Sequence, residues 1–77
     1  MQALLNNRVL ICPESAELYN RLVENEFYIG ESNDELTMHS NYEGDLYVVR
    51  AVKIYNFYVV VSIYNKTKLK EMSTLVD

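Results

Sequence analysis

The sequence predicts an α+β domain, in which a small antiparallel sheet of three to four strands carries one main helix, over about residues 13–25, on one face and a short C-terminal helix. Two observations favour this fold. Residues 46–54 and 57–64 are rich in Val, Ile and aromatic side chains, which suit strands. Residues 18–23 repeat apolar side chains at helical spacing. The 77 residues are expected to form one compact domain, residues 1–77.

The main helix is expected to begin at Pro13, because proline suits a first helical position, where its missing N–H leaves no hydrogen bond unmade. Glu14 follows in the first turn, where a negative charge is favourable at the positive end of the helix dipole. Residues 8–12 form a short apolar run ahead of the helix and are predicted to be a strand.

The two apolar runs are expected to pair as a hairpin around Tyr55 and Asn56, since Asn tolerates positive φ and a single strand through both runs would be unusually long. A weak edge strand is expected over residues 36–39. Gly44 supplies a turn before the first run. Apolar residues at helical spacing predict the C-terminal helix, namely Leu69, Met72 and Val76.

Alternation along the two runs separates two sheet faces. We expect one face to form the core beneath the helix; besides Arg50, its residues are Leu46, Val48, Val52, Ile54, Phe57, Val59, Val61 and Ile63. The other face is expected to form an exposed protein-binding interface, because large apolar patches and tyrosines mark such surfaces. Its candidate residues are Tyr47, Val49, Tyr55, Tyr58, Val60 and Tyr64. The open alternative is that the C-terminal segment covers this face.

Charge is distributed unevenly along the chain. The net charge is −4, yet residues 48–70 contain five bases and no acid, whereas residues 11–47 contain nine acids and one base. The candidate acidic surface consists of Glu24, Glu26, Glu31, Asp34, Glu35, Glu43 and Asp45. Two interpretations stay open for it: a solvated face that keeps the chain in solution, or a mimic of nucleic-acid phosphates.

Residues that carry chemistry are few. Cys12 and His39 are the single cysteine and histidine. Cys12 lies next to a helix start, which could lower its pKa, but a small buried cysteine is the commoner role. Glycine-rich phosphate loops and zinc- or calcium-ligand patterns are absent from the sequence. We therefore expect no enzyme activity, no cofactor and no metal. A lone cysteine and the short apolar runs predict a cytoplasmic protein, inside the source cell or a host cell.

The sequence thus favours a non-enzymatic protein-binding module, of the kind of small accessory or inhibitor protein that viruses and mobile elements encode to block a host protein. Its partner is expected to be another protein, and a homodimer is expected through the Tyr-rich face or an edge strand. The alternative is a small nucleic-acid-binding protein that uses Lys53, Lys66, Lys68 and Lys70 with Tyr55, Tyr58 and Tyr64. A third option is a small-molecule site at a dimer cleft.

Overall fold

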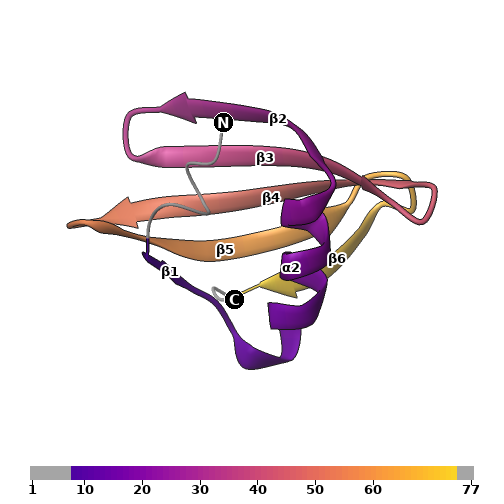
Figure 1. Cartoon of the computed structure of the whole chain (residues 1–77), viewed down its shortest axis with the longest axis horizontal. Helices are drawn as coiled ribbons and strands as arrows, with labels where there is room; N and C mark the ends of the chain where they lie inside the picture. Colours follow the sequence, from indigo (N-terminus) through magenta and orange to yellow (C-terminus); the bar gives the residue numbers. More distant parts are fainter. Residues whose placement is uncertain (1–7, 75–77) are drawn as a thin grey trace.

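The computed structural model describes residues 8–74 and consists of a curved sheet crossed by one α-helix (Figure 1). The elements in chain order are β1 (Arg8–Leu10), the 3-10 turn η1 (Pro13–Ser15), α2 (Ala16–Glu24), β2 (Glu26–Ser32), β3 (Glu35–Tyr42), β4 (Asp45–Ile54), β5 (Phe57–Asn65) and β6 (Lys70–Thr74). The strand order is β1-β5-β4-β3-β2, and β6 also pairs with β5. The β1–β5 pair is parallel and the other pairs are antiparallel.

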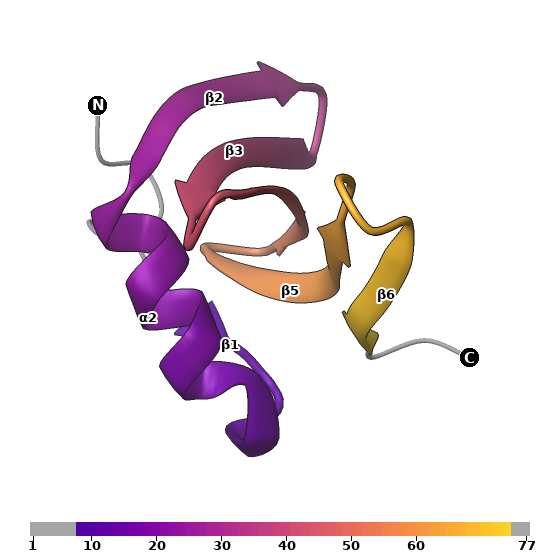
Figure 2. The ribbon, with the colours of Figure 1, turned by 90° about the vertical axis from the view of Figure 1, so that its right-hand side faces the viewer.

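One edge of β5 pairs with β4, and two strands share its other edge. β1 pairs with residues 57–59 and β6 with residues 62–65. The sheet therefore splits beyond β5. Figure 2 shows α2 and β1 on one side of the sheet and β6 on the other side. We call the face under α2 the inner face and the opposite face, toward β6, the outer face.

The core lies between α2 and the inner face. Tyr19, Leu22 and Val23 of the helix are buried against the strands. The Ser40 hydroxyl on β3 donates a hydrogen bond of 2.6 Å to the Leu22 carbonyl, which fixes the end of the helix on the sheet. The strands contribute the remaining buried apolar residues, which are Leu36, Met38, Tyr47, Val49, Ala51, Tyr58, Val60 and Ile63.

The predicted sheet and C-terminal helix were wrong. The sheet has six strands of mixed direction, and residues 36–39 belong to β3, which lies between β2 and β4. Residues 70–74 form β6, whose backbone hydrogen-bonds with β5. Over so few residues the spacing of Leu69 and Met72 fits a turn followed by a strand as well as a helix; Val76 lies outside the described residues. The main helix is confirmed, as η1 followed by α2.

The assignment of the two sheet faces was also wrong. The face that carries Val48 and Val52 was expected in the core, but α2 covers the face of Tyr47 and Val49. Both faces are apolar, so alternation alone could not decide between them. A β-bulge opposite Arg50 and Ala51 inserts Val61 into β5, and this reverses the alternation along the strand. Ile63 consequently lies on the inner face, and Ser62 and Tyr64 lie on the outer face.

The expected β4–β5 hairpin is confirmed, with Tyr55 and Asn56 in its turn. The positive φ falls on Tyr55, at 59°, and not on Asn56. Gly44 has a φ of 84° in the β3–β4 turn, as expected, because a residue without a Cβ takes this conformation without a clash.

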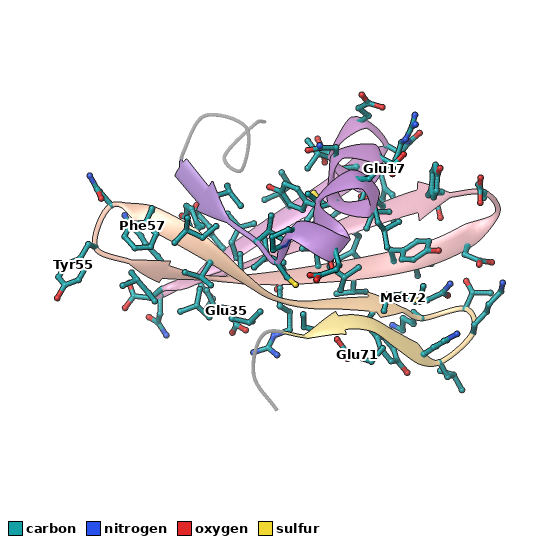
Figure 3. All side chains as sticks on the ribbon, turned by 90° about the horizontal axis from the view of Figure 1, so that it is seen from below. Glu17, Glu35, Tyr55, Phe57, Glu71 and Met72 are labelled. Carbon is teal, nitrogen blue, oxygen red and sulfur yellow. The ribbon has the colours of Figure 1, made fainter. Side chains whose placement is uncertain are left out.

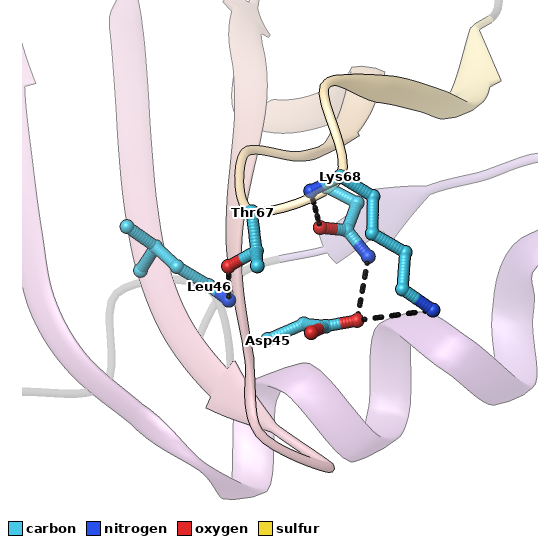
Figure 4. A network of polar contacts seen from close by, with 5 residues as sticks. Asp45, Leu46, Thr67 and Lys68 are labelled. Carbon is cyan, nitrogen blue, oxygen red and sulfur yellow. Dashed lines mark hydrogen bonds and ion pairs between the residues drawn. The ribbon is translucent and has the colours of Figure 1, made fainter.

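A polar network holds the turn between β5 and β6 against the start of β4 (Figure 4). The buried Asn65 side chain donates to Asp45 over 3.0 Å and accepts from the Lys68 backbone N–H over 2.9 Å. The Lys68 ammonium lies 3.6 Å from the same Asp45 carboxylate, and the Thr67 hydroxyl accepts from the Leu46 N–H over 2.8 Å. These contacts direct the chain back along β5 as β6.

Replacing Asn65 with Ala should lower the free energy of unfolding by about 2 kcal/mol, because both partners of a buried amide lose a hydrogen bond. Urea unfolding at neutral pH measures the change. Asn56→Ala, in the exposed β4–β5 turn, is the control and should change stability little. Equal effects of the two substitutions would show that the network does not hold the turn.

Stability above pH 10 should depend on Tyr19, whose buried hydroxyl has no hydrogen-bond partner among the described residues. Burial raises the pKa of Tyr19 from 10 to about 12, so the unfolded chain ionises first and stability falls as the pH rises from 10 to 12. Tyr19→Phe should remove a loss on the order of 2 kcal/mol and leave stability at pH 7 unchanged or slightly higher. Urea unfolding at pH 7 and near pH 12 tests this, with Tyr55→Phe as the exposed control. Equal losses of stability at high pH in the wild type and in both variants would contradict it.

Candidate protein-binding surface

The outer face, which α2 does not cover, carries rows in which apolar side chains stand beside polar ones. Register places neighbours from β3, β4 and β5 side by side on this face. These rows are His39–Val48–Tyr64, Thr37–Arg50–Ser62 and Glu35–Val52–Val59, followed by Ile54–Phe57 near the hairpin turn. Leu10 of β1 extends the Val59 row. We call these residues the outer rows.

Side chains of the outer rows stay partly open to solvent. The valines and Tyr64 are half-buried, whereas Leu10 and Ile54 are 49% and 42% exposed. Tyr55 beyond them, at the tip of the hairpin, is 90% exposed (Figure 3). A sheet face of this composition gains free energy when it is covered, at roughly 25 cal/mol per Å² of apolar surface.

A shallow hollow of about 360 Å³ lies on the outer face between the sheet and β6. His39, Val48 and Tyr64 are among the residues that line it. Glu71 of β6 stands at its rim and accepts a hydrogen bond of 2.8 Å from the Ser62 hydroxyl. Figure 3 shows Glu35 and Glu71 on this side of the sheet and Glu17 on the side of the helix. The outer face is therefore not flat, and a side chain of a partner can fill this hollow.

Charges on the outer face balance, unlike those of the whole chain. Arg50 and Glu35 form an ion pair with N···O distances of 2.6 and 2.7 Å. Lys66 and Glu71 line the hollow beside this pair. Two bases and two acids therefore share a face of a chain whose net charge is −4.

The predicted interface set does not form one surface. Tyr47, Val49, Tyr58 and Val60 are buried in the core under α2. The C-terminal segment, which was the open alternative as their cover, forms β6 on the opposite side of the sheet. Tyr64 lies on the outer face and Tyr55 at the hairpin tip, so only these two of the predicted set remain accessible.

Sequence reasoning missed the residues that do lie on the uncovered face, although one signal was present. Arg50 alternates with Val48 and Val52 in the face that was expected in the core. Arginine is rarely buried completely, so its presence favoured that face as the one open to water, but Lys53 follows Val49 and Ala51 on the other face and gave the opposite indication. The Tyr58 hydroxyl on the inner face instead reaches the edge, where it donates to Glu31 over 3.0 Å. Burial and this hydrogen bond raise the pKa of Tyr58.

The predicted acidic residues lie at opposite ends of the sheet. Glu31, Asp34 and Glu35 surround the β2–β3 turn, and Glu43 and Asp45 surround the β3–β4 turn. Within residues 8–74, three of the seven have side-chain partners: Glu31 with Tyr58, Glu35 with Arg50, and Asp45 with Asn65 and Lys68. A continuous mimic of a phosphate backbone is therefore not formed by the whole set; Glu24 and Glu26 lie where α2 passes into β2.

The residues of the nucleic-acid alternative are also separated. Tyr58 is buried and cannot stack on a base, and Lys68 pairs with Asp45. Lys53 and Tyr55 lie at one end of β5, whereas Lys66, Lys68 and Lys70 follow its other end. The structure therefore does not bring the whole set together, although Tyr64 and Lys66 line one hollow on the outer face.

Cys12 and His39 do not form a catalytic pair. The Cys12 thiol donates to the Glu14 carboxylate over 2.6 Å, and this hydrogen bond raises the thiol pKa, opposite to the lowering expected from a helix start. His39 packs edge-on against Tyr28 and Phe27, with ring centroids 5.3 and 6.2 Å apart. Within residues 8–74, no group of three or more His, Cys, Asp or Glu side chains is placed to hold a metal ion.

The Cys12 thiol should react slowly with an alkylating reagent, because a raised pKa leaves less thiolate at a given pH. Glu14→Gln removes the carboxylate and should lower the apparent pKa and increase the rate between about pH 7 and pH 9. Rates of iodoacetamide labelling against pH measure both. Glu17→Gln, one turn further along the helix, is the control, and a shift of equal size in that variant would contradict the assignment.

Comparison with known proteins gives no relative to guide the function: neither a protein-family model, nor a curated protein, nor a solved structure matches the chain. In the part of the chain that the structure describes, α2 and η1 are too short and too polar to cross a lipid bilayer. The outer face therefore stands as the candidate site on its geometry alone.

Proposed function

We propose that the chain is a non-enzymatic protein-binding module that dimerises through its outer face and acts by binding another protein, as a small accessory or inhibitor protein does. The observation that carries this proposal is the set of half-buried outer rows, which the single helix leaves open. Exposed apolar faces of this kind mark association surfaces. The lone, hydrogen-bonded thiol of Cys12 suits a reducing compartment such as the cytoplasm.

A second copy of the chain is the occupant that best fits the outer face. A twofold dimer brings the same residues together from both copies, so the surface must be compatible with itself. The balanced charges of Arg50, Glu35, Lys66 and Glu71 satisfy this condition, because each copy offers both signs. Two sheets packed face to face also bury alternate side chains of both, as in a β-sandwich.

The gain in stability also favours self-association. A domain of this length buries only about 60% of the surface that its unfolded chain exposes, so its own core gives limited stability. Here that core has one nine-residue helix against the inner face. Covering the apolar side chains of the outer rows would bury more apolar surface without a further helix or strand from the same chain.

Multi-angle light scattering tests the dimer. The wild-type chain should give twice the 9.0 kDa mass of one chain at about 100 µM. Val52→Lys places a charge in the outer rows, next to Glu35 in register, and should weaken the dimer by about tenfold or more.

Asn20→Lys adds the same charge on an exposed position of α2 and should leave the dimer intact. Circular dichroism confirms that both variants fold. A single-chain mass for the wild type at the highest concentration, or equal masses for the two variants, would overturn the proposed surface.

A further inference from the structure

Strand β2 has an edge whose backbone hydrogen-bonding groups meet no partner strand within residues 8–74. Among the described residues β2 pairs with β3 alone, and with seven residues it is longer than β1 or β6 on the opposite edge. An exposed strand edge is a template for another extended chain. The outer rows contain no residue of β2, and only Thr37 and Glu35 of those rows also line the hollow beside this edge.

Register identifies the residues whose backbone groups point away from β3. Ser32 and Glu35 flank a two-residue turn, so they form a hydrogen-bonded pair. Pairs alternate along an antiparallel ladder, which makes Glu31–Leu36 and Ile29–Met38 the pairs without mutual hydrogen bonds. The N–H and C=O groups of Glu31 and Ile29 are therefore directed to the free edge.

Charge selects what this edge can accept. The β2–β3 hairpin, residues 26–42, contains Glu26, Glu31, Asp34 and Glu35 and neither Lys nor Arg. The side chains of Glu26 and Asp34 take part in no ion pair within residues 8–74. A second copy docked edge to edge would bring like charges together, whereas a basic strand would be attracted.

A hollow of about 340 Å³ next to the edge provides a place for a basic side chain. Tyr28, Glu31 and Glu35 contribute to its wall, so a cation entering it meets an aromatic ring. The two acidic residues already have partners, Glu31 in Tyr58 and Glu35 in Arg50, and a basic side chain would add to these contacts. Gly30 allows the close approach of Tyr28: a Cβ at this position would lie 2.7 Å from the Tyr28 hydroxyl. Phe27 and Tyr28 are also more than half exposed along the strand.

We infer that β2 binds an extended segment of another protein as an added strand, and that this segment alternates Lys or Arg with apolar residues. The backbone groups of Ile29 and Glu31 would bind the segment, and the hollow beside Tyr28 would accept one of its basic side chains. The inference rests on the proposed function, since it names the chemistry of the partner that the module would bind.

The probe is a fluorescein-labelled peptide of about eight residues that alternates Lys and Val. Two matched peptides keep the same spacing. The peptide that alternates Glu with Val loses the positive charge, and the peptide that alternates Lys with Pro loses backbone N–H donors. Fluorescence polarisation at low salt should show the Lys-Val peptide binding about tenfold more tightly than either, with an affinity that falls as salt rises.

Glu31→Pro removes the outward N–H without breaking a ladder hydrogen bond, and Glu31→Ala removes the same carboxylate but keeps that N–H. The Pro variant should bind the Lys-Val peptide about tenfold more weakly than the Ala variant. Asp34→Lys, in the exposed turn, reverses a charge without touching the ladder and should also weaken binding. If the Glu31→Pro variant does not fold, the Asp34→Lys variant still tests the inference.

Three results would overturn the inference: no binding of the Lys-Val peptide, equal binding of the Lys-Pro peptide, or NMR shift changes that leave the residues of β2 unaffected. Failure of the dimer is distinguishable from failure at the edge. Val52→Lys should lose the dimer and keep peptide binding, and Glu31→Pro should do the reverse. A wild-type monomer that binds the peptide at β2 would refute the dimer and retain the edge site.

Discussion

One helix facing a sheet with two apolar faces is the constraint on which the rest of this structure depends. α2 has nine residues and spans about 14 Å, whereas β4 has ten residues and spans about 33 Å. The helix can therefore cover part of one face. On that face Tyr47 and Tyr58 add the volume that a longer helix would supply. The outer face has no such cover among the described residues and remains half open.

The division of one edge of β5 between β1 and β6 shapes the outer face further. The network around Asn65 turns the chain so that β6 leaves on the side opposite to α2. Glu71 then stands beside the outer rows and closes one wall of their hollow. The polar network around Asn65 thus places β6, and with it the hollow, beside the valines and aromatic rings of the outer face.

The same sheet presents two surfaces of different electrical character. The outer face carries balanced charges, which suits a second copy, and the β2–β3 hairpin carries acids alone, which suits a basic partner. The separation of acidic and basic residues along the sequence is therefore partly preserved as a separation between two surfaces of the folded chain. Glu35 belongs to both regions, because its ion pair with Arg50 joins the acidic hairpin to the outer rows.

Local chemistry in the sequence determined the helix after Pro13, the turn at Gly44 and the hairpin at Tyr55 and Asn56, since a proline, a glycine and two β-rich runs act over a few residues. The tertiary structure alone decided which sheet face is buried, because both faces are apolar and the bulge at Val61 exchanges them within β5. It also decided that residues 70–74 form a strand, because only pairing with β5 distinguishes that state from a helix. The predicted interface depended on which sheet face is exposed. Because that face is the one covered by α2, four of the six predicted residues lie in the core.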